Sequence, residues 1–175
     1  GECSGVGGRV HQGHPIEAAT DVSMMTRVGV ERILRFAFKL AQSRPRKLLT
    51  VITKSNAQGY GMVLWDEVFA AVAADFPGVK TDSLLIDAAV MEFVRRPESF
   101  DVVVASNLFG DILTDLAAII VGSMGLAPSA NIDPARKHPS MFEPVHGSAP
   151  DITGQGIANP LAAILSAAMM LEHLE

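Results

Sequence analysis

Two short runs of apolar and β-branched residues constrain the fold of this chain most. Residues 48–53 read Leu-Leu-Thr-Val-Ile-Thr, and residues 101–105 read Asp-Val-Val-Val-Ala. Continuous runs of this length are typical of strands buried in a sheet. Helical patterns surround them, at 28–42, 62–75, 83–95, 161–174 and in the segment that follows residue 105. Strands that alternate with helices predict a layered α/β fold, preceded by a glycine-rich loop or irregular ribbon over residues 1–15.

Two aspartates lie in the helix expected after the second strand. Asp111 and Asp115 stand four residues apart in the segment Asn-Leu-Phe-Gly-Asp-Ile-Leu-Thr-Asp, so their carboxylates share one helix face. Like charges repel at this spacing, and a divalent cation with oxygen ligands relieves that repulsion. Asp87 is a third acid in an apolar helical run. The alternative is that these acids belong to ordinary solvated helix faces.

Polar residues also follow both predicted strands. Lys54 comes directly after residues 48–53, and Asn107 lies two residues after the run 101–105. Ligands of open α/β sheets gather where loops leave the carboxyl ends of strands. This placement favours a site that includes the aspartates, but it does not identify a reaction.

A second candidate site is rich in Gly, Pro and small polar residues. It runs from Phe142 to Asn159, ahead of an apolar helix for which Asn159 is the expected N-cap and Pro160 the first helical residue. Glycines allow close backbone approach, the ring of His146 can stack or form a hydrogen bond, and Asp151 can accept from a diol. These groups suit an adenosine; the alternative is a structured connecting loop. No GxGxxG motif follows a strand, so a standard Rossmann site is not supported.

Composition excludes several classes of protein. The net charge of -5 argues against general binding to nucleic acid or to anionic membranes. The apolar stretches are interrupted by Gly or Pro and are shorter than the roughly 20 residues of a membrane span. A single cysteine, Cys3, suits a reducing compartment, and we expect a cytoplasmic protein. Because the sequence starts without Met and stops within a helical pattern, we also expect it to be a piece of a longer polypeptide.

Three segments resemble the metal-dependent β-decarboxylating dehydrogenases, which include isocitrate, isopropylmalate and tartrate/D-malate dehydrogenases. They are the segments 106–115, 125–131 and 142–151. The stretches Ala130-Asn-Ile-Asp-Pro-Ala-Arg and Thr53-Lys-Ser-Asn are most similar to the tartrate/D-malate branch. The resemblance covers nearly the whole chain and implies an isopropylmalate dehydrogenase-like layered sheet with helices, incomplete because the N-terminal portion of the family is absent.

The resemblance also implies roles for individual residues. Asp111 and Asp115 match metal-binding aspartates, and Asp87 matches a third one that the family contributes from the neighbouring subunit. Lys54 matches a lysine that assists proton transfer at the substrate hydroxyl and is also donated across the subunit interface, and Asn56 matches an asparagine near the nicotinamide. The adenosine loop is matched by His146, Gly147, Ser148, Ala149, Asp151, Ile152 and Asn159. A carboxylate at Asp151 implies NAD, since it accepts ribose hydroxyls and repels a 2′-phosphate.

The implied reaction oxidises a small 2-hydroxy dicarboxylic acid, such as tartrate or D-malate, by hydride transfer to NAD. Mn²⁺ or Mg²⁺ then stabilises the enolate left when CO₂ departs, and K⁺ is expected as a further ion. The implied assembly is a homodimer with shared active sites. We expect residues 1–121 to form the interface domain with the dimer contacts and the metal site, and residues 122–175 to be part of the larger domain with the adenosine loop.

Two departures from the family leave other interpretations open. Cys3 stands where the family has a tyrosine that protonates the enol product, which makes a catalytic role for Cys3 doubtful. The substrate-binding arginines of the family's N-terminal portion are missing. The chain is therefore interpreted as a segment of a working dehydrogenase, inactive alone; the alternatives are a truncated or degenerate homologue that dimerises without catalysis, and a regulatory partner subunit.

Overall fold

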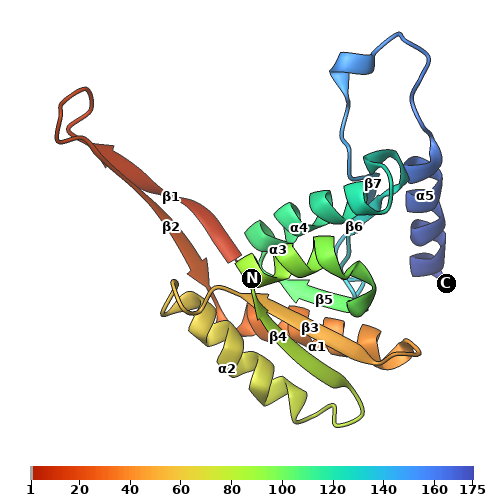
Figure 1. Ribbon diagram of the computed structural model, residues 1–175, viewed down its shortest axis with the longest axis horizontal. Coiled ribbons are helices and arrows are strands. Elements are labelled where there is room, and N and C mark those ends of the chain that lie inside the picture. The colour runs from red at the N-terminus through yellow and green to blue at the C-terminus, as the bar shows by residue number, and fades with distance from the viewer. Residues whose placement is uncertain (1) are drawn as a thin grey trace. The chain divides into compact units, whose positions relative to one another are not determined.

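A computed structural model describes residues 2–175, with side-chain environments from residue 5 onward. The chain divides into two compact units, Gly1–Asp111 and Ile112–Glu175 (Figure 1). The division falls inside helix α4 (Asn107–Ile120), which therefore belongs to both units. The expected domain boundary at residue 121 stays a prediction.

A three-stranded parallel sheet organises the first unit. Its strands are β3 (Leu48–Thr53), β4 (Lys80–Leu85) and β5 (Val102–Ala105), in the order β4-β3-β5. Helices α1 (Arg27–Ser43) and α2 (Gly61–Ala73) lie on one side of this sheet, and α3 (Ile86–Arg95) lies on the other (Figure 1). A short 3-10 helix, η1 (Pro97–Ser99), leads into β5. The predicted layered α/β fold is confirmed.

The core of this unit forms where α1 and α2 pack on the sheet. Central strand β3 is buried from its second residue to its last, which explains its continuous apolar sequence. Phe38 of α1 is fully buried, and its ring lies 5.3 Å from that of Phe69 and 5.1 Å from that of Phe76. Thr26 accepts a hydrogen bond from the backbone N–H of Gly29 and so caps the start of α1.

An antiparallel hairpin precedes α1. Strands β1 (Glu2–Val10) and β2 (Ala18–Met25) pair with each other alone, and β2 contacts α2 near the base of the hairpin (Figure 1). From residue 5 to residue 24 the side chains are exposed, including those of Val6, Val10 and Met24. A two-stranded ribbon of this kind has marginal stability by itself.

The second unit combines the end of α4 with a small sheet and one helix. Strands β6 (Pro128–Asn131) and β7 (Met141–Pro144) pair antiparallel, and α5 (Leu161–Leu174) packs on them. Two 3-10 helices complete the unit, η2 (Met124–Leu126) and η3 (Pro150–Ile152). Arg136 donates hydrogen bonds to the carbonyls of His173 and Leu174, which joins the β6–β7 turn to the last turn of α5.

Several sequence-based expectations need correction. Residues 1–15 contain the whole of β1, so of the two expected forms the structure has the irregular ribbon, with a register shift between Cys3 and Val6. The helix expected over 83–95 begins at Ile86 because residues 80–85 form β4. Helix α5 begins at Leu161, so Pro160 is its N-cap and not its first residue, although Asn159 Oδ1 still accepts from the Leu161 N–H. In the described part of the chain, no helix is long and apolar enough to span a membrane.

Candidate functional site

The parallel pairing of β3 and β4 brings Lys54 to Asp87. Thr53, the last residue of β3, pairs with Leu85, the last residue of β4, so Lys54 and Asp87 follow neighbouring strands at the same edge of the sheet. Lys54 Nζ lies 2.5 Å from Asp87 Oδ1. The hydrogen bond from Lys54, together with one from the backbone N–H of Asp87 itself, holds the pKa of the Asp87 carboxyl below its ordinary value.

Hydrogen bonds fix the backbone before and after Lys54. Thr53 is 1% exposed, and its hydroxyl donates to Asp66 Oδ1 of α2 over 3.0 Å. The carbonyl of Lys54 accepts from the N–H groups of Ala57 and Gln58, at 3.0 and 2.8 Å. The side chain of Lys54 therefore leaves a fixed turn at the carboxyl end of β3, while its ammonium group stays partly exposed.

Asp111 and Asp115 both lie on α4, as expected, and both side chains are exposed. β5 pairs with β3 through Ile52 and Ala105, so α4 starts from the same edge of the sheet that carries Lys54. Helical spacing places the two carboxylates on one face, with hard oxygen ligands a turn apart.

The described residues of one chain do not assemble a metal site of three or more such ligands. Over residues whose placement is described, no group of three or more His, Cys, Asp or Glu side chains could hold a metal ion. Two carboxylates on α4 suit a hard divalent cation but leave most of its coordination open. The expected sharing of Asp87 between two chains is compatible with this arrangement and stays a prediction.

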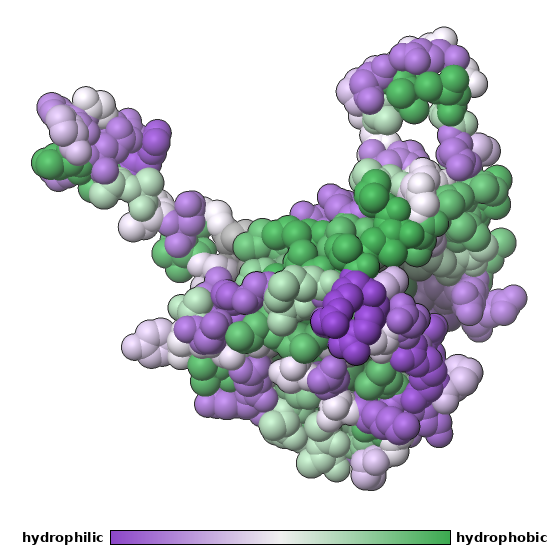
Figure 2. All heavy atoms as spheres, viewed as in Figure 1, coloured by the Kyte–Doolittle hydropathy of each residue, from purple (hydrophilic) through white to green (hydrophobic). Residues whose placement is uncertain are grey.

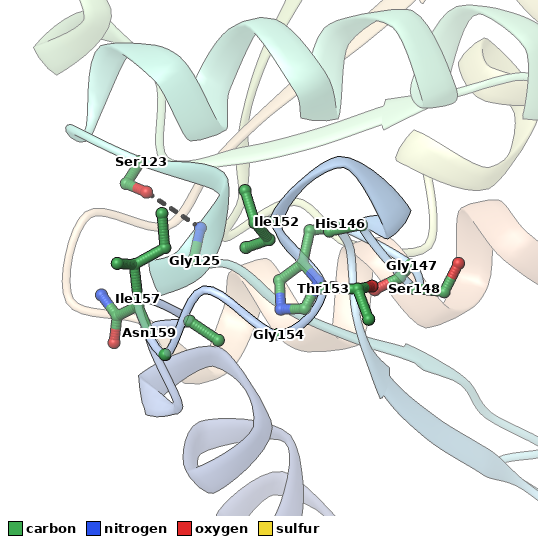
Figure 3. Close-up of a pocket in the computed structure, with 13 residues that line it drawn as sticks. Ser123, Gly125, His146, Gly147, Ser148, Ile152, Thr153, Gly154, Ile157 and Asn159 are labelled. Atoms are coloured by element: carbon green, nitrogen blue, oxygen red, sulfur yellow. Dashed lines mark hydrogen bonds between the residues drawn. The ribbon is translucent and has the colours of Figure 1, made fainter.

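The loop between β7 and α5 surrounds a cavity of about 420 Å³ (Figure 3). Ser123, Gly125, Ile157 and Asn159 lie on one side of it in this view, and His146 on the other. Glycines with positive φ shape the loop, and residues 153–154 and 156–159 contribute to the wall as well. The volume lies in the range of small-molecule pockets, and the wall offers mostly backbone and small side chains.

The loop holds its shape through local contacts. His146 Nδ1 lies 2.8 Å from the carbonyl oxygen of Gly147, and Gln155 donates to the carbonyl of Asp151. Ala149 adopts a left-handed conformation, φ 42° and ψ 61°, directly before η3. Such a conformation is unfavourable for a residue with a side chain and is found where the surrounding chain enforces it.

The structure brings most of the expected cofactor residues together. Those that line the cavity are His146, Gly147, Ser148, Ala149, Ile152 and Asn159. Asp151 is exposed in η3 and does not line it, and Asn56 is exposed on the turn after Lys54, in the other unit. The side chain of Cys3 lies outside the described residues. All of these roles stay predictions.

Sequence reasoning missed the wall that η2 provides. Ser123 and Gly125 line the cavity although they lie twenty or more residues ahead of the loop in sequence. Ser123 Oγ accepts a hydrogen bond from the Gly125 N–H over 3.0 Å (Figure 3). The Gly-Gln-Gly segment at 154–156 indicated in the sequence that the loop continues past η3. No sequence pattern near residues 123–126 indicated that η2 lies beside this loop.

The parallel sheet with its polar carboxyl edge and the glycine-lined cavity define an α/β protein with the fold of an enzyme. A family model described as isocitrate/isopropylmalate dehydrogenase matches residues 4–175, and the chain belongs to that family. It is 62% identical over 174 residues to a probable tartrate dehydrogenase/decarboxylase of Agrobacterium vitis, covering 99% of this chain and 49% of the relative.

Two further relatives agree. The D-malate dehydrogenase (decarboxylating) of Escherichia coli strain K12 is 56% identical over 174 residues, which are 99% of this chain and 48% of that protein. The crystal structure of isocitrate dehydrogenase from Methylococcus capsulatus superposes with a TM-score of 0.90 at 43% identity, covering 97% of this chain and 49% of that one. The chain thus spans about half the length of the relatives it matches.

Proposed function

We propose that this chain is part of an NAD- and divalent metal-dependent dehydrogenase that oxidises and decarboxylates a small 2-hydroxy dicarboxylic acid such as tartrate or D-malate. The observation that carries the proposal is the Lys54–Asp87 pair at the carboxyl edge of the sheet, where α4 with Asp111 and Asp115 also begins. Similarity to a probable tartrate dehydrogenase/decarboxylase and to a D-malate dehydrogenase supports the substrate class.

In this proposal Lys54 of the second copy, which lies beside Asp87 of that same copy, handles the proton of the substrate hydroxyl. Lys54 must first release a proton to solvent; its neutral Nζ then accepts the hydroxyl proton while a hydride leaves the same carbon for the nicotinamide, so that a 2-oxo acid forms and the cofactor is reduced. Loss of CO₂ follows, and a proton must then be returned to carbon. A bound Mn²⁺ or Mg²⁺, held by Asp111 and Asp115 with Asp87 of a second copy, would lower the energy of negative charge on the substrate oxygens.

The loop cavity supports the cofactor part of the proposal. Its glycine backbone and small side chains admit a flat ring, and His146 stands at the wall where a base can stack. Asp151 lies exposed on η3, where a carboxylate suits ribose hydroxyls better than a 2′-phosphate. K⁺ and a cytoplasmic location, the latter supported by the single cysteine, belong to the same proposal.

We further propose that the chain works as a homodimer. Exposed apolar side chains gather on the hairpin at Val6 and Val22 and on α3 at Met91 and Val94. Isolated ribbons and apolar helix faces of this kind are stabilised when a partner covers them. Sedimentation equilibrium is expected to show a dimer, and a monomer at micromolar concentration would contradict shared sites.

Calorimetric titration with Mn²⁺ tests the metal site. We expect saturable binding by the wild-type chain and its loss in Asp111→Asn, which removes one anionic ligand at constant size. Asp82→Asn, on the exposed edge strand β4, is the matched control and should bind like wild type. Equal binding by both variants would show that α4 holds no metal, and the chain would then be a non-catalytic homologue.

A further inference from the structure

The loop that surrounds the cavity is attached to its unit at its two ends. Each hydrogen bond found for residues 146–158 joins two residues of that loop. None of these residues is fully buried. No hydrogen bond described for residues 146–158 therefore ties the loop to the rest of its unit, and its position depends strongly on the two points where it begins and ends.

Both ends of the loop rest on the segment Ser123–Ala127. At the first end, the N–H of Val145 donates to the carbonyl of Ala127 over 3.1 Å, which continues the β6–β7 ladder by one step. At the second end, the side chain of Asn159 packs directly on Gly125 (Figure 3). One short segment after α4 thus holds the loop closed.

Gly125 leaves little room for a side chain. A Cβ added there would lie 3.1 Å from Asn159 Cβ and 3.3 Å from Ser123 Oγ. Both neighbours are held by hydrogen bonds: Ser123 Oγ accepts from the Gly125 N–H, and Asn159 Oδ1 accepts from the Leu161 N–H at the start of α5, both over 3.0 Å. A methyl group at this position requires Asn159 or Ser123 to move away by a few tenths of an ångström, against these two hydrogen bonds.

We propose that Gly125 is a positioning residue for the cavity, because its missing side chain allows Asn159 to close the second end of the loop. The ligand assigned to the cavity, an adenosine moiety, rests on the proposed function, whereas the closure of the loop does not. A loop held closed before binding loses less conformational entropy when a ligand arrives, so its anchor raises affinity without touching the ligand.

The test compares Gly125→Ala with two other variants by hydrogen exchange of residues 146–158 and by calorimetry with AMP. Gly78→Ala is the matched control, since a Cβ at Gly78 meets nothing within 4 Å and its backbone needs no positive φ. Asn159→Gly, alone and combined with Gly125→Ala, removes the Cβ that the new methyl group would strike.

We expect Gly125→Ala to speed exchange of the loop and to weaken AMP binding about tenfold by loss of preorganisation, while Gly78→Ala changes neither. Adding Asn159→Gly should bring loop exchange back to that of Asn159→Gly alone, a non-additivity that a merely destabilising change does not produce. Wild-type exchange in Gly125→Ala, or additive effects in the double variant, would overturn the inference. A wild-type chain that binds no AMP would overturn the proposed nucleotide site instead, and loop exchange would then decide on Gly125 alone.

Discussion

Replacing Thr53 by Val tests how the turn before Lys54 is held. The change removes the hydroxyl that donates to Asp66 Oδ1 over 3.0 Å and keeps the volume of a side chain that is 1% exposed. A hydrogen bond to a charged acceptor contributes about 1.5–3 kcal/mol to the free energy of unfolding. The bond from Thr53 to Asp66 should lie at the lower end of this range, because the Asp66 side chain is half-exposed. The valine methyl group that replaces the hydroxyl is buried, and its burial offsets roughly 0.8 kcal/mol of that loss.

The expected net destabilisation is therefore about 1 kcal/mol, and a double-mutant cycle isolates the hydrogen bond itself. Thr53→Val combined with Asp66→Ala should show a coupling free energy of about 1–2 kcal/mol. Urea unfolding followed by fluorescence gives these values, because the chain has one tryptophan, Trp65, buried on α2 next to Asp66. Thr50→Val, at an equally buried position of β3, is the control and should not couple to Asp66. A coupling below about 0.3 kcal/mol for Thr53 would refute the reasoning.

Other predictions concern charge and packing. In an NMR titration the Asp87 carboxyl should have a pKa below the ordinary Asp value, and Lys54→Met should raise it towards that value. Folding lowers the pKa of this carboxyl. The ion pair therefore contributes to the free energy of unfolding at pH values above about 3.9, the pKa in the unfolded chain, and this contribution is lost as the pH falls through the lower pKa of the folded chain. Phe38→Ala should lower the free energy of unfolding by about 3–5 kcal/mol, since the ring is fully buried among other rings. Tyr60→Ala, at a side chain that is 95% exposed, should change it by less than about 0.5 kcal/mol.

The sequence predicted the two apolar strands of the parallel sheet and missed the polar edge strand β4. Strands β3 and β5 are apolar because they are covered by helices, so their composition identifies them. β4 reads Lys-Thr-Asp-Ser-Leu-Leu and is mostly exposed, and residues such as Asp and Lys are depleted in strands. That missed strand is the one that carries the chain to Asp87, so sequence spacing alone could not show that Lys54 and Asp87 touch.

The cavity was predictable only where its residues are continuous in sequence. Gly, Pro and small polar residues indicated the loop after β7, and His146 and Asn159 do line the cavity. The wall formed by Ser123 and Gly125 depends on how α5 and β7 pack beside η2, which is a tertiary contact.

In the second unit, α5 also exposes a set of large apolar side chains (Figure 2): Leu161, Ile164, Leu165, Met170, Leu171 and Leu174. Helical spacing had indicated a helix there but not which of its faces is covered.

The single chain pairs Asp87 with Lys54, and among the residues that the structure describes no third His, Cys, Asp or Glu joins Asp111 and Asp115 of α4 in a metal-binding group. If two chains complete each metal site, Mn²⁺ binding and dimerisation are linked, and each must strengthen the other by the same factor. The apparent Mn²⁺ affinity should therefore rise with chain concentration across the range in which sedimentation shows dimers forming. Added Mn²⁺ should likewise lower the dimer dissociation constant of the wild-type chain and leave that of Asp111→Asn unchanged. A Mn²⁺ affinity independent of chain concentration, in a chain that sediments as a monomer, would mean that α4 binds the ion alone, and Asp87 would then be a partner of Lys54 rather than a metal ligand.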